Sequence, residues 1–76
     1  PGKVEVVLVR EADGSFRLVA GERSVPLKSR DHAVFGEVAR YVPPGTVLRV
    51  RGVVPDEAFL GAAAVLAALG VESVWD

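Results

Sequence analysis

Residues 46–75 have the sequence TVLRVRGVVPDEAFLGAAAVLAALGVESVW, and this stretch decides the fold. Its first part, residues 47–51, alternates between apolar and basic side chains. Such alternation predicts a strand with two apolar residues on one face and Arg49 and Arg51 on the other, together with a valine. Gly52 interrupts the pattern and ends the strand.

A helix follows directly, because residues 58–69 contain no polar side chain and are bounded by suitable start and stop residues. Pro55 suits the first helical position, and the acidic pair Asp56-Glu57 complements the positive end of the helix dipole. Gly70 is placed at the C′ position, where helices often need a left-handed residue. Residues 71–75 then form a closing strand.

This helix has more apolar surface than one neighbouring layer can bury. Phe59, Ala63 and Leu66 form a stripe that suits a core, with further apolar residues beside it. The opposite face consists of small or apolar residues: Gly61, Ala62, Val65 and Ala68. That face needs a cover, either within the domain or from another chain.

The first half of the chain predicts a hairpin and an edge strand. Residues 3–10 form a β-branched strand that is apolar on both faces, which suggests a central position. Asp13-Gly14 supplies a tight turn, and residues 16–20 return antiparallel. After a second turn, residues 24–27 extend the sheet, where Pro26 confines them to an edge.

A first helix is predicted over residues 30–42, with Ser29 or Asp31 as its cap. Pro43-Pro44-Gly45 ends it. Apolar residues recur at three- and four-residue spacing and would face the sheet: Val34, Phe35, Val38, Ala39, Tyr41 and Val42. The charged residues Arg30, Glu37 and Arg40 would face water.

Together these elements predict one α+β domain over residues 1–76, in β-β-α-β-α-β order. A strand–helix–strand unit of this kind forms a right-handed parallel crossover. Both helices must then cover one face of a mixed sheet, which gives a two-layer sandwich.

Composition limits the function further. Half of the 76 residues are apolar, which is a high share for a small domain and favours self-association as a homodimer. The net charge of −1 gives no reason to expect nucleic-acid binding. The longest uncharged run, residues 58–71, is shorter than the roughly 20 residues that span a bilayer. Without cysteine there is no disulfide and no zinc–thiolate site.

Few residues suggest catalysis, so we expect no enzymatic activity, no cofactor and no metal. His32 and Asp31 are adjacent, and adjacent helical residues point about 100° apart, which is poor geometry for a catalytic dyad. An enzyme that uses this pair is the weakest alternative. Asp56 and Glu57 could serve acid–base chemistry or hold a cation, but stabilisation of the helix dipole explains them.

Two groups of residues are candidates for binding. Arg17, Arg49 and Arg51 could line the outward sheet face and hold a carboxylate or phosphate, or they could pair with Glu5 and stay solvated. Trp75, near the end of the chain, is either a core residue or an anchor at an interface, where tryptophan is enriched. Val65, on the outer helix face, is a second candidate for partner contact.

The sequence VLRVRGVVPDEAFLGAAAVLAALGVESVWD resembles the end of the periplasmic domain of ExbD/TolR-type biopolymer transport proteins. The similar parts are the arginine-rich strand at 47–51, the Val-Pro-Asp-Glu helix start at 54–57, the run VLAALG at 65–70 and the closing strand. The first half also fits that family's order, with strands around Asp13-Gly14 and Val-Pro-Leu at 25–27 before a helix.

The resemblance implies a non-enzymatic domain in an envelope complex driven by the proton-motive force. It implies a homodimer and a TonB- or TolA-like protein, or the cell wall, as partner. Two interpretations of the chain stay open. It is the soluble part of a longer, membrane-anchored periplasmic protein, or a complete cytoplasmic protein whose Pro1 follows a removed initiator Met. The second would suit a freestanding domain that binds an anionic small molecule through its arginines.

Overall fold

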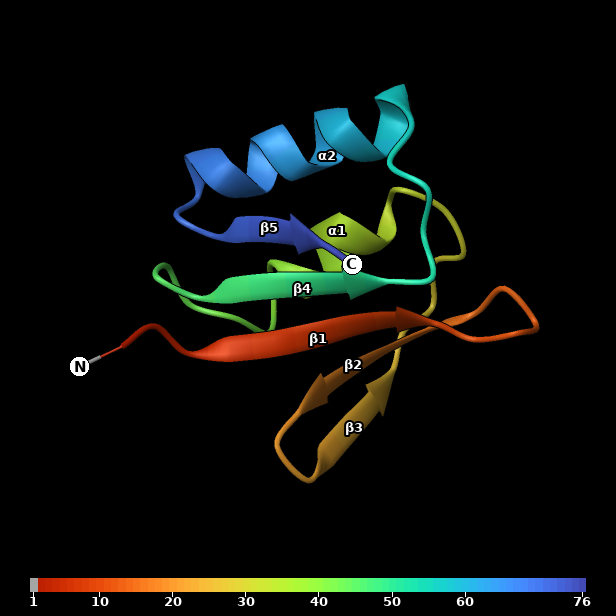
Figure 1. The fold of residues 1–76 in the computed structure, drawn as a ribbon, viewed down its shortest axis with the longest axis horizontal. Helices are drawn as coiled ribbons and strands as arrows, with labels where there is room; N and C mark the ends of the chain where they lie inside the picture. Colours follow the sequence, from red (N-terminus) through yellow and green to blue (C-terminus); the bar gives the residue numbers. More distant parts are fainter. Residues whose placement is uncertain (1) are drawn as a thin grey trace.

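The fold combines one mixed sheet with two helices in a computed structural model that describes residues 2–76 (Figure 1). The interpretation of Pro1 as the start of a complete protein lies outside the described residues. The predicted α+β class and element order are confirmed, including the additional edge strand. The elements are β1 Glu5–Arg10, β2 Phe16–Ala20, β3 Arg23–Pro26, α1 Val34–Val38, β4 Val47–Arg51, α2 Glu57–Ala68 and β5 Glu72–Trp75.

The strands follow the order β3-β2-β1-β4-β5 across the sheet. β1 pairs antiparallel with β2 and parallel with β4, and β4 pairs parallel with β5 across the α2 connection. The central place of β1 explains why both of its faces are apolar. β3 and β5 are the two edges, and Pro26 lies on the β3 edge as predicted.

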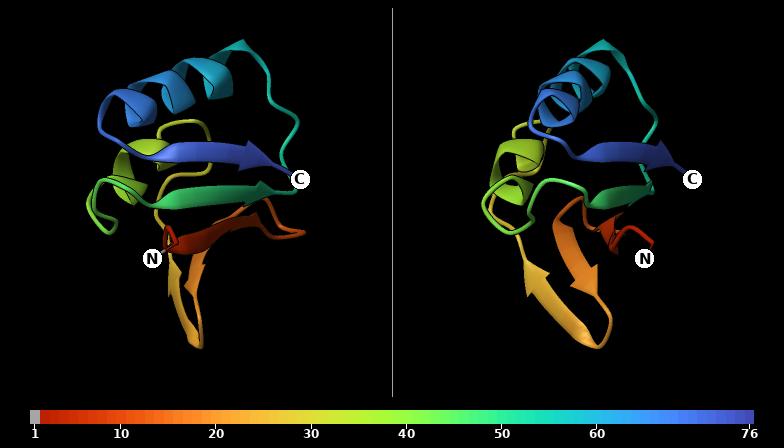
Figure 2. Two further views of the ribbon diagram at one scale, coloured as in Figure 1. Left: turned by 60° about the vertical axis from the view of Figure 1, so that its left-hand side comes forward. Right: turned by 90° about the vertical axis from the view of Figure 1, so that its left-hand side faces the viewer.

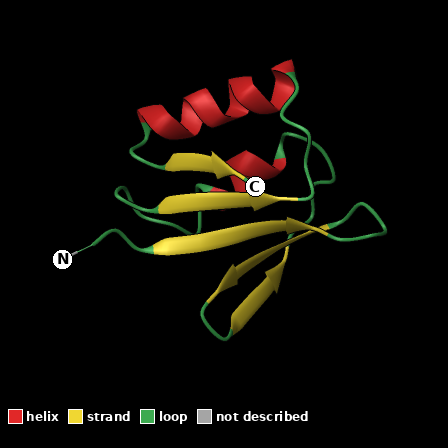
Figure 3. Ribbon diagram, viewed as in Figure 1, coloured by secondary structure: helices red, strands yellow, loops and turns green. Residues whose placement is uncertain are grey.

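Both helices (red in Figure 3) lie on the same side of the sheet (yellow), as the views in Figure 2 show. The core forms between them and the strand residues that face them. Its members are Val6, Leu8, Phe16, Leu18, Leu27, Val34, Phe35, Val38, Leu48, Val50, Val53, Phe59, Leu66 and Val71. The inward residues of β1 and β4 are those that the alternating pattern predicts.

Aromatic contacts connect the helices to the sheet. The ring centroid of Phe59 lies 6.4 Å from that of Phe16 and 5.9 Å from that of Phe35. Phe35 in turn stacks on Trp75 with a centroid distance of 5.9 Å. Trp75 is therefore half-buried against the core and helps to hold β5 beneath the helices.

The first helix is much shorter than residues 30–42, and that prediction is wrong in length. Neither Ser29 nor Asp31 is its cap, since α1 begins after Ala33. The flanking backbone is wound more tightly, with bonds between residues three apart on both sides of α1, such as Val34 N–H to Asp31 O and Tyr41 N–H to Val38 O. Gly36 lowers helix propensity within this short segment.

Residues near α1 consequently take other roles. Glu37 does not simply face water, because its carboxylate accepts hydrogen bonds from the backbone N–H groups of Lys28 and Ser29. Tyr41, which we expected on the apolar side of the helix, lies beyond its end and is 54% exposed.

The second helix agrees with the prediction except at its first turn. Asp56 is the N-cap, and its Oδ1 accepts a hydrogen bond of 2.9 Å from Phe59 N–H. Pro55 therefore precedes the cap and is not the first helical residue. The acidic residue caps the helix directly, in addition to complementing its dipole.

Gly70 and Gly61 should respond in opposite ways to substitution by alanine. Gly70 has a φ of +85°, and an added Cβ would lie 2.9 Å from the Cβ of Pro44. Gly70→Ala should therefore lower the free energy of unfolding by about 2 kcal/mol. Gly61 lies inside α2 with open space at the Cβ position, so Gly61→Ala should raise it by about 0.5–1 kcal/mol. Urea unfolding of both variants measures these changes, and effects of the same sign would contradict this account.

Candidate functional site

The sheet face opposite the helices carries the arginine side chains. No helix of residues 2–76 lies on this face (Figure 2). Half-buried valines form its floor: Val7, Val9, Val19, Val47 and Val74. The long aliphatic stems of arginine can cover such valines while the guanidinium groups stay in water. This explains how an apolar sheet face remains uncovered by a second layer.

Arg49 and Arg51 converge on one carboxylate. Asp76 accepts hydrogen bonds of 2.7 Å from Arg49 Nη1 and from Arg51 Nε, one to each of its two oxygens. Arg49 also donates to Glu5, with 3.2 Å between Nε and Oε1. The predicted pairing of this arginine face with Glu5 is thus present, and Asp76 adds a second acidic partner.

These contacts change the proton affinities of the group. Hydrogen bonds from Arg51 and Arg49 lower the pKa of the Asp76 carboxyl below its ordinary value of 3.8. Hydrogen bonds to Glu5 and Asp76 raise the pKa of Arg49 further above its already high value. Asp76 and Arg49 are therefore both charged near neutral pH. With two arginines and two acidic residues, the network is balanced rather than strongly basic.

Arg17 does not join this network. It lies on β2 opposite Val9, whereas Arg51 lies on the other side of Val9 on β4. Its Nε donates a hydrogen bond of 2.7 Å to Ser24 Oγ and lies 4.0 Å from Glu11. The structure thus brings Arg49 and Arg51 together and leaves Arg17 on the far side of β1.

The outer surface of α2 is the second candidate. Only Phe59 and Leu66 of this helix are fully buried. Leu60, Val65 and Leu69 are 49%, 63% and 53% exposed. Val65 and Leu69 line an apolar groove of about 380 Å³ between α1 and α2, together with His32, Phe35 and Ala39 among others.

Trp75, the other predicted contact residue, has one ring face against Phe35 and also lines a groove beside α2. Trp75 is therefore a partly buried residue at the edge of the core. A partner that occupied this groove would touch Trp75 without displacing it from the core.

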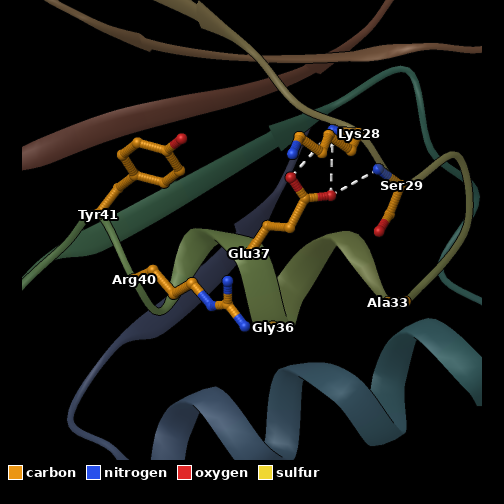
Figure 4. A pocket seen from close by; sticks show the side chains of 7 residues that line it. All are labelled: Lys28, Ser29, Ala33, Gly36, Glu37, Arg40 and Tyr41. Carbon is orange, nitrogen blue, oxygen red and sulfur yellow. Dashed lines mark hydrogen bonds between the residues drawn. The ribbon is translucent and has the colours of Figure 1, made fainter.

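The residues considered for catalysis are held in structural contacts. The Asp31 carboxylate accepts a hydrogen bond from Ala33 N–H, and the exposed His32 ring lies edge-on to Phe59 at 6.4 Å. A hollow of about 510 Å³ beside α1 contains Glu37, but Figure 4 shows its carboxylate directed at the backbone of Lys28 and Ser29. The hydrogen bond from the Lys28 N–H is the largest cause that lowers the pKa of the Glu37 carboxyl, and hydrogen bonds from Ser29 lower it further.

Sequence reasoning missed two features. Arg10 lies over the rings of Phe16 and Phe59, at 4.9 Å and 5.7 Å from their centroids, where cation–π attraction stabilises it. Asp76 was not expected beside the arginines. The parallel crossover indicated only that β5 lies beside β4, and the register of that pair, with Trp75 opposite Val50, is what brings Asp76 to Arg51.

No family model, characterised protein or solved structure matches this chain. The ExbD/TolR resemblance therefore stays a prediction from the sequence pattern. The longer helix, α2, has 12 residues, and no helix described in residues 2–76 has the length and apolarity that a bilayer crossing requires. The same residues contain no group of three or more acidic or histidine side chains that could hold a metal ion.

The Asp76 network should make stability depend on pH. The carboxyl binds its proton less tightly in the folded protein than in the unfolded chain, so it stabilises the fold above pH 3.8. That contribution is lost as the pH falls through the lower, folded pKa. Asp76→Asn should therefore lower the free energy of unfolding at neutral pH, and the difference from wild type should shrink below pH 3.8.

Chemical denaturation across this pH range measures the difference. Glu22→Gln, in the exposed turn between β2 and β3, is the matched control and should leave the pH profile unchanged. Added salt should weaken the Asp76 effect, because these charges are partly exposed. An Asp76→Asn difference that stays constant with pH would refute the account.

Proposed function

We propose that this chain is a non-enzymatic interaction domain similar to the periplasmic part of ExbD/TolR-type transport proteins. The observation that carries the proposal is the outer face of α2, which is apolar, uncharged from Ala58 to Leu69, and exposed along its length. Monomeric proteins seldom keep a continuous apolar face of this kind in water. Such a face is typical of contact with another protein.

A second copy of the chain is the first partner that we propose. Gly61 and Ala68 on the exposed side would allow two α2 helices to approach closely, with Val65 packed beside them. A 12-residue helix is about 18 Å long, so this face alone buries less than the roughly 800 Å² per partner of a standard interface. The proposed homodimer is accordingly weak, in the micromolar range.

The wider assembly follows from the sequence resemblance. In that proposal the domain works in the periplasm as part of a membrane complex and contacts a TonB- or TolA-like protein or the cell wall. This requires a membrane anchor encoded upstream, an apolar segment of about 20 residues that contains one Asp. A coding sequence without such a segment would refute the membrane assignment and leave a cytoplasmic domain.

Val65→Glu should weaken the homodimer, because it places a charge in the apolar contact. We expect the dissociation constant from sedimentation to rise about tenfold or more. Val4→Glu is the matched control, since Val4 is 65% exposed and Val65 is 63% exposed, and Val4 lies far from α2 in the sequence. Wild-type protein that sediments as a monomer at high micromolar concentration, or equal effects of both variants, would refute this interface.

Anion binding by the arginine face is a second candidate function, favoured by one observation. Arg49 and Arg51 together hold a carboxylate, that of Asp76, so their geometry suits a carboxylate or phosphate ligand that displaces it. Arg17, on the far side of β1, could reach only a larger ligand. Thermal shift across a panel of carboxylates and phosphates tests this.

Under this second candidate, stabilisation by an anion should increase in Asp76→Asn, where the competing carboxylate is gone. It should disappear in Arg49→Ala with Arg51→Ala. No stabilisation of either wild type or Asp76→Asn by any anion in the panel would exclude the candidate.

A further inference from the structure

The β5 edge has backbone groups that no strand in residues 2–76 pairs with. On the inner side, Glu72 N–H donates to Thr46 O and Asp76 N–H donates to Val50 O, with distances of 3.2 Å and 3.0 Å. Successive residues of a strand direct their backbone groups to opposite edges. The N–H and C=O groups of Ser73 and Trp75 therefore point away from the sheet.

A groove runs along this open edge. The helix α2 lies next to β5 on the side away from β4 in Figures 1 and 2. Between them is a groove of about 460 Å³. Apart from Glu72, its lining is small or apolar: Leu60, Ala63, Ala64 and Ala67 from α2, Gly70, and Ser73 and Trp75 from β5. The wall formed by α2 is mostly alanine, which leaves room beside the strand.

A buried hydroxyl lies in the wall of the same groove. Ser73 Oγ is shielded from solvent and has no hydrogen-bond partner within the described part of the chain. A buried polar group without a partner is costly. An occupant with its own polar backbone could reduce that cost after a small adjustment of the serine rotamer.

We propose that the β5 edge and this groove bind an extended peptide segment of a partner protein by strand addition. The segment would pair its backbone with Ser73 and Trp75. Every second side chain, small and apolar, would enter the groove. The intervening side chains would lie on the open sheet face near Glu72, where a basic residue could join Lys3, whose Nζ lies 3.5 Å from Glu72 Oε1.

The unpaired backbone groups select an extended segment rather than a helix as the occupant. A second copy of β5 is a poorer occupant, because it brings its own α2 along the edge where the first α2 already lies (Figure 1). The proposal deepens the proposed interaction function and rests on it only in assigning the domain a protein partner. The α2 dimer face and this groove are separate surfaces with separate tests.

The probe is the acetylated and amidated peptide KVKVKVK, whose valines alternate with lysines. Its fully backbone N-methylated form is the control, because it has no amide donors for strand pairing. At about 1 mM peptide, exchange of the Ser73 and Trp75 amide hydrogens should slow about tenfold or more. Exchange at Glu72 and Asp76, whose amides already donate to Thr46 O and Val50 O, should change little. Fluorescence of Trp75, the sole tryptophan of the chain, reports the same event.

Two variants test the groove. Ala67→Glu places a charge in the groove and should weaken peptide binding about tenfold. Ala12→Glu is the matched control in the exposed turn after β1, and it should bind the peptide as wild type does. Circular dichroism confirms that both variants are folded.

The proposal is overturned if neither amide is protected at this peptide concentration, or if the N-methylated peptide acts equally. It is also overturned if protection grows with protein concentration alone, since a second copy would then occupy the edge. If the protein stays monomeric and the peptide still slows exchange of the Ser73 and Trp75 amides, the α2 dimer is refuted and the peptide site is supported. If the protein dimerises but the peptide does not slow exchange of either amide, the peptide site is refuted and the α2 dimer is supported.

Discussion

The contacts of Phe59 hold the two layers of this protein together. A single helical side chain meets Phe16 of the sheet and Phe35 of α1, and Phe35 extends the contact to Trp75 of β5. Arg10 adds to this cluster, because its guanidinium lies over the rings of Phe16 and Phe59. Because large aromatic rings supply this contact, α2 needs only a narrow stripe of residues to stay bound to the sheet. The remainder of the helix surface is left free.

That narrow stripe gives the molecule two contrasting faces. On the open sheet face, arginine stems cover valines and the charged ends are neutralised by Glu5 and Asp76. On the helix side, the exposed surface has no charge over more than three turns. Contacts through α2 should depend on shape and apolar area, and salt should influence them little. Contacts through the open sheet face should depend strongly on salt, since the charged side chains there are already paired and are partly exposed.

Much of the fold followed from local sequence signals. β4 has the predicted bounds because strict alternation between Gly45 and Gly52 leaves little choice, and both glycines have positive φ. The first helix was overestimated because periodicity alone does not distinguish an α-helix from a series of three-residue turns. Within the candidate site, Glu5 was foreseeable as a partner of Arg49 from strand alternation. Asp76 was not, because its position depends on the register of a parallel pair that only the complete sheet fixes.

The two edges of the sheet are built differently. Pro26 at the end of β3 has no N–H to offer to a neighbouring molecule, and the charged residues Glu22 and Arg23 lie where that strand begins. The β5 edge has no proline, and its one charged residue, Glu72, lies at the start of the strand. If one molecule placed its β3 against the β5 of the next, the sheet could grow into a filament. Pro26 blocks that head-to-tail addition, so a protein with one open edge can remain in solution without seeding fibres.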